Sequence, residues 1–179
     1  MTNIAILGFG VVGGGVADHI VKNYKEVTRL GGDEINIKYI LDLRDFPDSP
    51  FADKVVHDYN IILEDSEVST VIEVMGGSHP AYEFTVSALK AKKNVITSNK
   101  EVVANFGDEF LALAKENSID GVFYWEPLWL PGEGICWASE AGQEYIHEEG
   151  KSTSNEWANQ CLFDYEGKML PAFGEYTNI

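Results

Sequence analysis

Three glycines near the start of the chain have the spacing of a phosphate-binding turn. Gly8, Gly10 and Gly13 form G-x-G-x-x-G, directly after an apolar run and at the start of a helical pattern. In such a turn the first glycine allows the tight bend, the second admits a pyrophosphate, and the third lets helix and strand pack closely. The N–H groups at the helix N-terminus face the phosphates. The expected cofactor contacts are therefore Gly8, Phe9, Gly10, Val11, Val12 and Gly13; the alternative is a glycine-rich turn without a ligand.

Two charged residues at the end of the second expected strand bear on the choice between NAD and NADP. Asp42 could accept a hydrogen bond from a ribose 2′-hydroxyl, and Arg44 could pair with a 2′-phosphate. Asp42 lies farther from Gly13 than the usual spacing of about 20 residues, so the rule for the acidic residue applies poorly. Either residue could instead be part of a solvated strand end. The two residues alone leave both cofactors open.

A lysine follows the strand pattern NVITSN. Lys100 stands just beyond this strand, where a side chain can point into a cofactor crevice. Its charge could orient a hydroxyl or carbonyl group, and a lowered pKa would let it move protons. The alternative is a surface lysine on the first turn of a helix, which Asn99 could cap.

Strands and helices must alternate along the chain to position these residues. The strand patterns are NIAILGFG, INIKYILDL, STVIEVMGG, NVITSN and GVFYWE, with a short strand possible in VVHDYNIIL. One helix is expected over residues 11–30, another from His79-Pro80 to Lys93, and two more on either side of Gly107. This alternation predicts an α/β fold, a Rossmann-like doubly wound parallel sheet with right-handed crossovers.

Composition narrows the class of protein. The chain has 179 residues, 45% of them apolar and 23% charged, which is typical of a globular domain. Its net charge of −16 argues against binding nucleic-acid phosphates. No apolar run approaches the ~20 residues of a membrane span. The first residues lack a signal peptide, which favours a cytoplasmic location. Two cysteines without metal-ligand spacing predict no metal site.

The composition changes near residue 120. Residues 1–119 carry a net charge of −7, whereas residues 120–179 carry −9 in half the length. All four tryptophans and both cysteines (Cys136 and Cys161) lie in the second part. We therefore predict two segments, 1–119 and 120–179, with different histories.

Four motifs of the first segment, ILGFGVVGGGV, LRD, IEVMGG and VITSNKE, closely resemble the cofactor domain of homoserine dehydrogenase. The resemblance implies that Arg44 meets the 2′-phosphate, which favours NADP and leaves NAD possible. It adds Met75, Gly76, Gly77 and Ser98 to the cofactor contacts, and it places Lys100 beside the nicotinamide and the substrate as the catalytic residue. The family's substrate and dimerisation domain has no counterpart in the motifs that follow. We therefore expect no turnover, and a monomer or a weak homodimer formed through a sheet edge.

The second segment resembles a different family. GVFYWEPLWLP, GICWASEAG and EWANQCLFDYEGKMLPAF are similar to the C-terminal end of endo-β-1,4-galactanases, which are (β/α)8-barrel glycoside hydrolases. The resemblance implies a last strand and helix like the end of that barrel, without the two catalytic carboxylates that a retaining glycosidase needs. Both of the families that the two segments resemble are parallel α/β folds, so residues 121–126 are expected to pair with the strand at 94–97. The hypothesis is a chimera joined at residues 118–121.

Three functions follow from these resemblances. The first is an NAD(P)-binding domain of homoserine dehydrogenase type, whose parent reaction is hydride transfer between NAD(P) and homoserine or aspartate semialdehyde. The second is an engineered or fragmentary α/β scaffold without a ligand. The third is a remnant of a galactan-hydrolysing enzyme.

Overall fold

The structure is a computed structural model and describes residues 1–119, 121–123 and 168. The chain divides after Gly121, and the unit Met1–Gly121 contains every described helix and strand. Residues 121–123 are not in a strand, so the described part of the expected strand at 121–126 is wrong. The rest of that strand, and the galactanase-like helix expected after it, lie outside the described residues.

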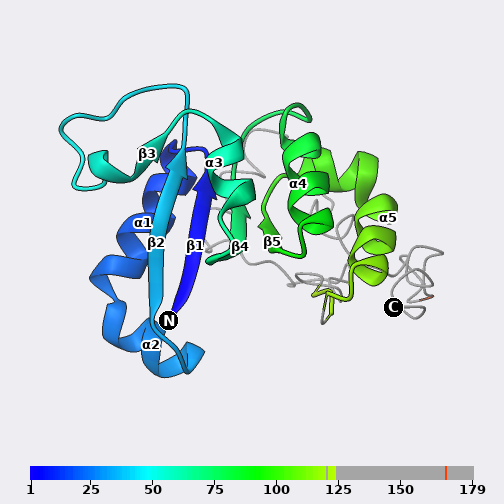
Figure 1. Cartoon of the computed structure of the whole chain (residues 1–179), viewed down its shortest axis with the longest axis horizontal. Coiled ribbons are helices and arrows are strands. Elements are labelled where there is room, and N and C mark those ends of the chain that lie inside the picture. Colours follow the sequence, from blue (N-terminus) through cyan, green and yellow to red (C-terminus); the bar gives the residue numbers. More distant parts are fainter. Residues whose placement is uncertain (120, 124–167, 169–179) are drawn as a thin grey trace, which may run out of the picture. The chain divides into compact units, whose positions relative to one another are not determined.

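Five parallel strands form the sheet of this unit: β1 (Thr2–Leu7), β2 (Ile35–Leu41), β3 (Val55–Val56), β4 (Val68–Glu73) and β5 (Asn94–Thr97). Their order is β3-β2-β1-β4-β5 (Figure 1). The chain therefore moves outward from β1 in one direction through β2 and β3, and then in the other direction through β4 and β5. This topology confirms the predicted Rossmann-like doubly wound sheet, and its switch point lies between β1 and β4.

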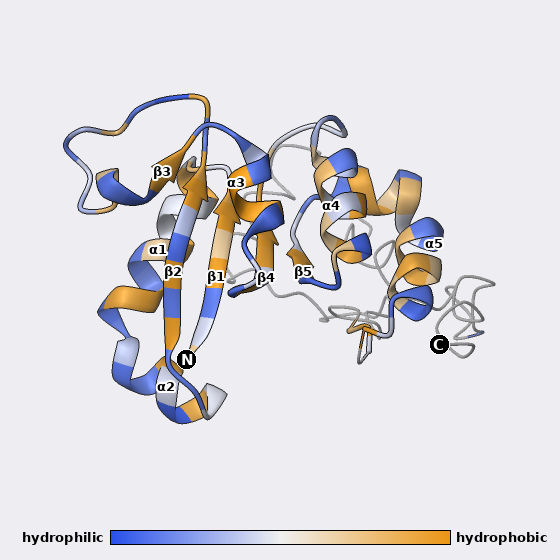
Figure 2. Cartoon of the chain, viewed as in Figure 1, coloured by the Kyte–Doolittle hydropathy of each residue, from blue (hydrophilic) through white to orange (hydrophobic). Residues whose placement is uncertain are grey.

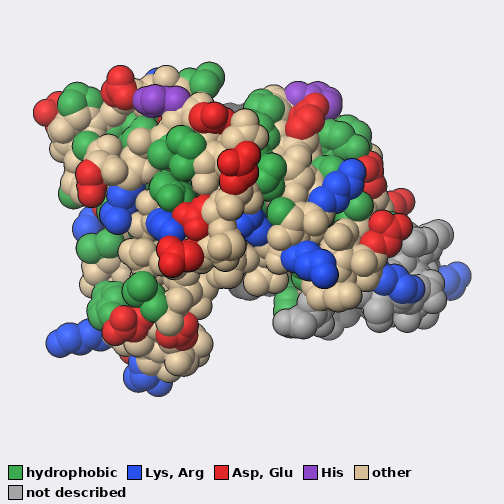
Figure 3. All heavy atoms as spheres, in the orientation of Figure 1, with side chains coloured by type: hydrophobic (Ala, Val, Ile, Leu, Met, Phe, Trp, Pro, Cys, Tyr) green, Lys and Arg blue, Asp and Glu red, His purple; other side chains and the backbone are tan. Residues whose placement is uncertain are grey.

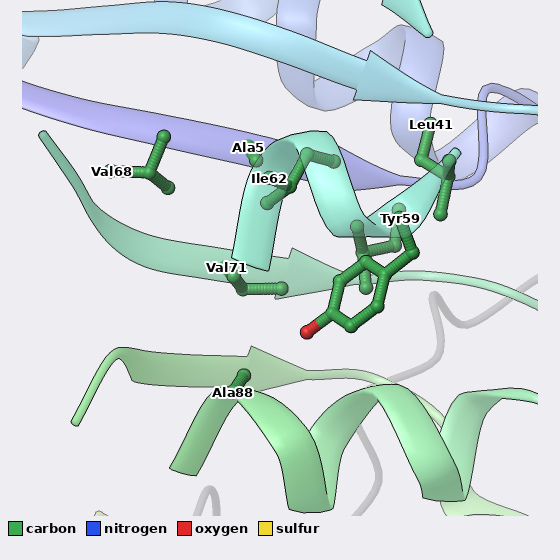
Figure 4. Packing of buried hydrophobic residues seen from close by; sticks show 8 residues of the cluster. Ala5, Leu41, Tyr59, Ile62, Val68, Val71 and Ala88 are labelled. Atoms are coloured by element: carbon green, nitrogen blue, oxygen red, sulfur yellow. The ribbon is translucent and has the colours of Figure 1, made fainter. Parts of the chain in front are cut away.

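Helices cover both faces of the sheet because the central strand is apolar on both sides. Ile4 and Ile6 of β1 pack with Ala17 of α1 (Val11–Lys22) and with Phe51, next to the 3-10 helix η1 (Ala52–Lys54). Ala5 and Leu7 of β1 pack toward α3 (Tyr59–Glu64) and α4 (Ala81–Lys90) (Figure 4). A strand buried on both faces is typical of parallel sheets, and the hydrophobic colouring of the C-terminal part of β1 in Figure 2 follows from it. Burial of each isoleucine or leucine contributes about 1.5–3 kcal/mol.

Two helix predictions were wrong. Residues 11–30 form two helices, because α1 ends at Lys22 and α2 (Tyr24–Gly31) begins after Asn23. Asn23 ends α1 with its backbone N–H and its side-chain amide both donating to the carbonyl of His19.

The predicted break at Gly107 is absent, and α5 (Lys100–Glu116) is continuous through it. A glycine inside a helix costs only about 0.5–1 kcal/mol relative to alanine. Four α5 side chains are buried, namely Val102, Leu111, Leu113 and Ala114, and their burial outweighs that cost. No helix in the described part of the chain is both long and apolar enough to cross a membrane. Figure 3 shows acidic and basic side chains interspersed on the face that it displays.

A charged cluster links the start of β4 to β2. Asp65 accepts hydrogen bonds from Lys38 Nζ at 2.5 Å, Tyr39 Oη at 2.9 Å and the backbone N–H of Glu67 at 2.9 Å. The Lys38 ammonium group is the main cause that lowers the pKa of Asp65 to about 2. The ionised form of Asp65 therefore stabilises the fold.

This cluster predicts a loss of stability in acid. Because the pKa of Asp65 is lower in the folded chain, its contribution is complete above pH ~4, the ordinary Asp value, and is lost as the pH falls toward 2. Asp65→Asn should lower the free energy of urea unfolding at pH 6, and most of that difference from wild type should vanish by pH 2.5. The control is Asp18→Asn, which breaks an exposed ion pair with Lys22 and should have little effect at either pH. A pH-independent effect of Asp65→Asn would contradict the assignment.

Candidate dinucleotide-binding site

The glycine turn that follows β1 depends on two close approaches of the backbone. Gly8 has φ +97°, in the left-handed region that favours glycine, and its N–H donates to the Leu41 carbonyl at 2.8 Å. A Cβ on Gly13 would lie 1.9 Å from the Gly8 carbonyl oxygen. The first and third glycines are therefore required by the fold itself.

The middle of the turn is open. Gly10 is the N-cap of α1, and a Cβ on Gly10 would meet no described atom within 4 Å. The first N–H groups of an α-helix have no acceptor within the helix, so this end of α1 presents donors to a ligand. Val11 is 95% exposed and Val12 is 53% exposed beside it. The turn thus has both the donors and the space that a pyrophosphate needs.

Asp42, one residue beyond β2, is bound to the glycine turn. Its carboxylate accepts the Phe9 N–H at 2.8 Å and the Arg44 N–H at 3.0 Å. It also accepts Nε and Nη2 of Arg44, both at 3.0 Å. The Arg44 guanidinium group is the main cause that holds the pKa of Asp42 well below its usual range, against the opposing effect of partial burial. Asp42 is therefore an anion that holds the Phe9 N–H. Both of its carboxylate oxygens already accept hydrogen bonds from Phe9 and Arg44.

Arg44 stays accessible although it pairs with Asp42. Its side chain is 64% exposed, and its guanidinium carbon lies 5.0 Å from the centre of the Phe46 ring. Phe46 packs edge-on against Phe9 of the glycine turn, with ring centroids 4.9 Å apart. These contacts hold the cation next to the glycine turn at the C-terminal edge of β2.

The two other predicted turns lie at the same edge of the sheet. Met75, Gly76 and Gly77 follow β4, and a Cβ on Gly8 would lie 3.1 Å from Met75 Cγ. Asn99 caps α5 by accepting the Val102 N–H at 3.2 Å, as predicted, and its amide donates to the Gly77 carbonyl at 2.7 Å. The structure therefore brings the glycine turn, the Met75–Gly77 turn and the start of α5 together.

Ser98 and Lys100 flank this capping residue, and both are exposed. The Ser98 N–H donates to the Glu73 carbonyl at 3.2 Å, which ties the turn after β5 to the end of β4. Lys100 begins α5 and forms no ion pair with any residue of the described part.

Glu73, the last residue of β4, is fully buried and is not among the residues predicted from the sequence. An acidic residue inside the apolar run VIEV was the signal that could have identified it. A cavity of about 170 Å3 lies elsewhere, between the C-terminal end of α1 and the N-terminal half of β2. No cluster of metal-ligating side chains occurs within residues 1–119 or 121–123.

A doubly wound parallel sheet with G-x-G-x-x-G at its switch point defines a dinucleotide-binding domain of Rossmann type. Comparison with known families is more specific. The family model described as "Homoserine dehydrogenase, NAD binding domain" matches residues 8–123, well over half of the chain. The chain belongs to this family, and the described unit is an NAD- or NADP-binding domain. The match extends past the joint predicted at residues 118–121.

Individual relatives agree with the family match. Homoserine dehydrogenase of Lactococcus lactis is 38% identical over 123 residues, which are 65% of this chain and 28% of the relative. The enzyme of Bacillus subtilis is 37% identical over 127 residues, 67% of this chain and 28% of the relative. This chain thus spans little more than a quarter of the length of these relatives.

Solved structures show the same fold. The crystal structure of Staphylococcus aureus homoserine dehydrogenase at pH 6.5 superposes with a TM-score of 0.60 at 36% identity, covering 66% of this chain and 30% of that one. A hyperthermophilic archaeal homoserine dehydrogenase in complex with NADPH gives a TM-score of 0.54 at 28% identity, covering 65% and 41%.

Proposed function

We propose that residues 1–119 bind NADP(H) in preference to NAD(H) and form a cofactor-binding domain for the homoserine dehydrogenase reaction. In this proposal the pyrophosphate lies on residues Gly8 to Gly13, and the 2′-phosphate meets Arg44. The single observation that carries the preference is the Asp42–Arg44 pair. Asp42 already accepts four hydrogen bonds from Phe9 and Arg44, whereas Arg44 remains 64% exposed.

This pair favours a phosphate over a hydroxyl for an electrostatic reason. An acidic residue that selects NAD needs an oxygen atom available to accept the ribose 2′-hydroxyl. At this edge the occupied acceptor is Asp42 and the exposed group is a cation, whose planar fork suits a phosphate. The structure of the archaeal relative in complex with NADPH is consistent with the proposal.

Titration of the chain with NADPH and with NADH, followed by nicotinamide fluorescence, tests this preference. Arg44→Ala should weaken NADPH binding about tenfold or more, because a hydrogen bond to a charged group is worth about 1.5–3 kcal/mol. NADH binding should change less than about threefold, and Arg44→Lys should retain part of the NADPH affinity because it keeps the charge. Equal losses for both cofactors would instead show that Arg44 acts only by holding Asp42.

Lys100 is proposed to be the catalytic residue of this part. Its support is its place at the C-terminal edge of β5, in the turn that Asn99 ties to Gly77. From this edge a lysine beside the nicotinamide would hold or move the proton of the substrate hydroxyl as the hydride is transferred. Met75, Gly76, Gly77 and Ser98 are proposed to line the crevice between the glycine turn and Lys100.

The remaining predictions concern residues 120–179 and assembly. We keep as proposals the division at residue 119, the galactanase-like origin of residues 120–179 and the chimera. A cytoplasmic location and a monomer or weak homodimer are also kept. The support for edge-mediated association is β5, the last strand of the described sheet, where Ile96 is 56% exposed.

A further inference from the structure

Glu73 is a fully buried carboxylic acid at the C-terminal end of β4. Acidic side chains are almost never fully buried unless they are paired. No lysine, arginine or histidine of the described residues forms an ion pair with Glu73. An apolar residue would fill this position without the cost of removing a carboxyl group from water. Packing alone therefore does not explain why an acidic residue occupies this position.

Hydrogen bonds from two different turns surround this acid. Its Oε1 accepts the Met75 N–H at 2.8 Å and has a longer contact of 3.5 Å with Asn99 Nδ2. Its Oε2 accepts the hydroxyl of Thr97 at 2.5 Å. That hydroxyl oxygen accepts the Asn99 N–H at 3.0 Å, which leaves its proton for Glu73. Every partner thus donates to Glu73, the pattern that a carboxylate requires.

Asn99 extends this network to the helix that begins with Lys100. Its amide donates to the carbonyl oxygens of Gly77 at 2.7 Å and Met75 at 3.3 Å, while its Oδ1 caps α5. The Met75–Gly77 turn and the start of α5 are therefore connected both directly and through the buried carboxylate. Loss of the carboxylate would loosen both turns together.

We propose that Glu73 is a positioning residue that fixes the Met75–Gly77 turn against the start of α5, and so shapes the part of the crevice that takes the nicotinamide half of the cofactor. This inference rests on the proposed function. Arg44 and β2 lie on one side of the switch point, so the adenosine half belongs there. The nicotinamide half then belongs on the side of β4 and β5, where Glu73 lies.

The test compares two probes on the full chain. NADPH uses both halves of the site, whereas 2′,5′-ADP carries only the adenosine and its phosphates. Glu73→Gln keeps the size of the side chain but replaces one of its two oxygen atoms with an NH2 group. That group cannot accept the hydrogen bond that the carboxylate oxygen accepts. We expect this variant to bind NADPH about tenfold more weakly, as for one lost hydrogen bond to a charged group. Its affinity for 2′,5′-ADP should stay within about twofold of wild type.

Matched variants separate positioning from general damage. Glu67→Gln makes the same chemical change at an exposed residue near the opposite end of β4 and should leave both affinities unchanged. Thr97→Val removes the donor to Glu73 and should reproduce the selective loss, and Thr97→Ser should restore binding because it keeps the hydroxyl. The Thr97 pair also supplies the test if Glu73→Gln fails to fold, which circular dichroism will show.

The outcomes are distinct. A loss confined to NADPH, shared by Glu73→Gln and Thr97→Val and rescued by serine, supports the inference. Equal loss of both probes, or no loss of either, overturns it while leaving the proposed cofactor site standing. If the wild-type chain binds neither NADPH nor 2′,5′-ADP, the proposed function itself is overturned, and this inference with it.

Discussion

Gly10→Val is expected to abolish tight NADPH binding while leaving the domain folded. A Cβ on Gly10 meets no described atom within 4 Å, and the backbone there is extended with a negative φ of −83°, so the position does not need the left-handed conformation that favours glycine. The space beside Gly10 is instead the space through which a pyrophosphate reaches the first N–H groups of α1. Because the valine side chain would occupy it, we expect the Kd for NADPH to rise at least about tenfold, or 1.4 kcal/mol.

Fluorescence titration and thermal unfolding together check this result. The unfolding midpoint of Gly10→Val should stay within a few degrees of wild type, since surface substitutions usually change stability by about 0.5 kcal/mol or less. Gly31→Val is a matched control, because Gly31 is equally open but lies at the end of α2, outside the turn. It should keep the wild-type affinity. Unchanged NADPH binding by Gly10→Val would remove the glycine turn from the proposed site.

Gly13→Ala should fail in the opposite way, through the fold. The new Cβ would lie 1.9 Å from the Gly8 carbonyl oxygen, and backbone at both positions would have to move. Inserting one carbon into a packed interior typically costs about 1–3 kcal/mol and occasionally more. Here the obstacle is backbone rather than a mobile side chain, so we expect a loss of about 3 kcal/mol or more in urea unfolding at pH 7.

The adjacent glycine supplies the control for this prediction. Gly14 is also in α1, but a Cβ there meets nothing within 4 Å. Gly14→Ala should be neutral or stabilising by about 0.5–1 kcal/mol, because alanine favours the helix. A Gly13→Ala variant as stable as wild type would mean that α1 does not approach Gly8 this closely.

Gly10→Val and Gly13→Ala test two different roles within the glycine motif, namely binding of the cofactor and formation of the turn. The motif predicted a tight bend at Gly8, the approach of a pyrophosphate at Gly10 and close helix packing at Gly13. In the structure Gly8 and Gly13 are needed for the turn to form, whereas Gly10 leaves space for a ligand. Binding measurements on Gly13 variants would therefore mix two causes, and Gly10 is the position that reports on the cofactor.

The pattern of residues was sufficient for most of the strands and for the sheet they form. The strands β2 and β5 lie within their predicted patterns, and β1 and β4 begin one residue before theirs, because an apolar run is a local signal. The helix ends were predicted less well. Asn23 ends α1 through its contacts with His19, a local signal that the apolar periodicity does not contain. Burial of α5 side chains keeps that helix continuous through Gly107, and this burial depends on tertiary packing.

By itself, therefore, the sequence determined the fold class, the glycine turn and the Asn99 cap, because each depends on neighbours within a few residues. Only the tertiary structure decided the hydrogen-bond partners of Asp42 and of Glu73. Asp42 meets Phe9 across 33 residues and Glu73 meets Thr97 across 24. A parallel sheet creates such contacts by bringing the C-terminal ends of distant strands to one edge. Whether a carboxylate there binds a ligand or holds a turn depends on whether donors of the folded chain already lie within hydrogen-bond distance of it.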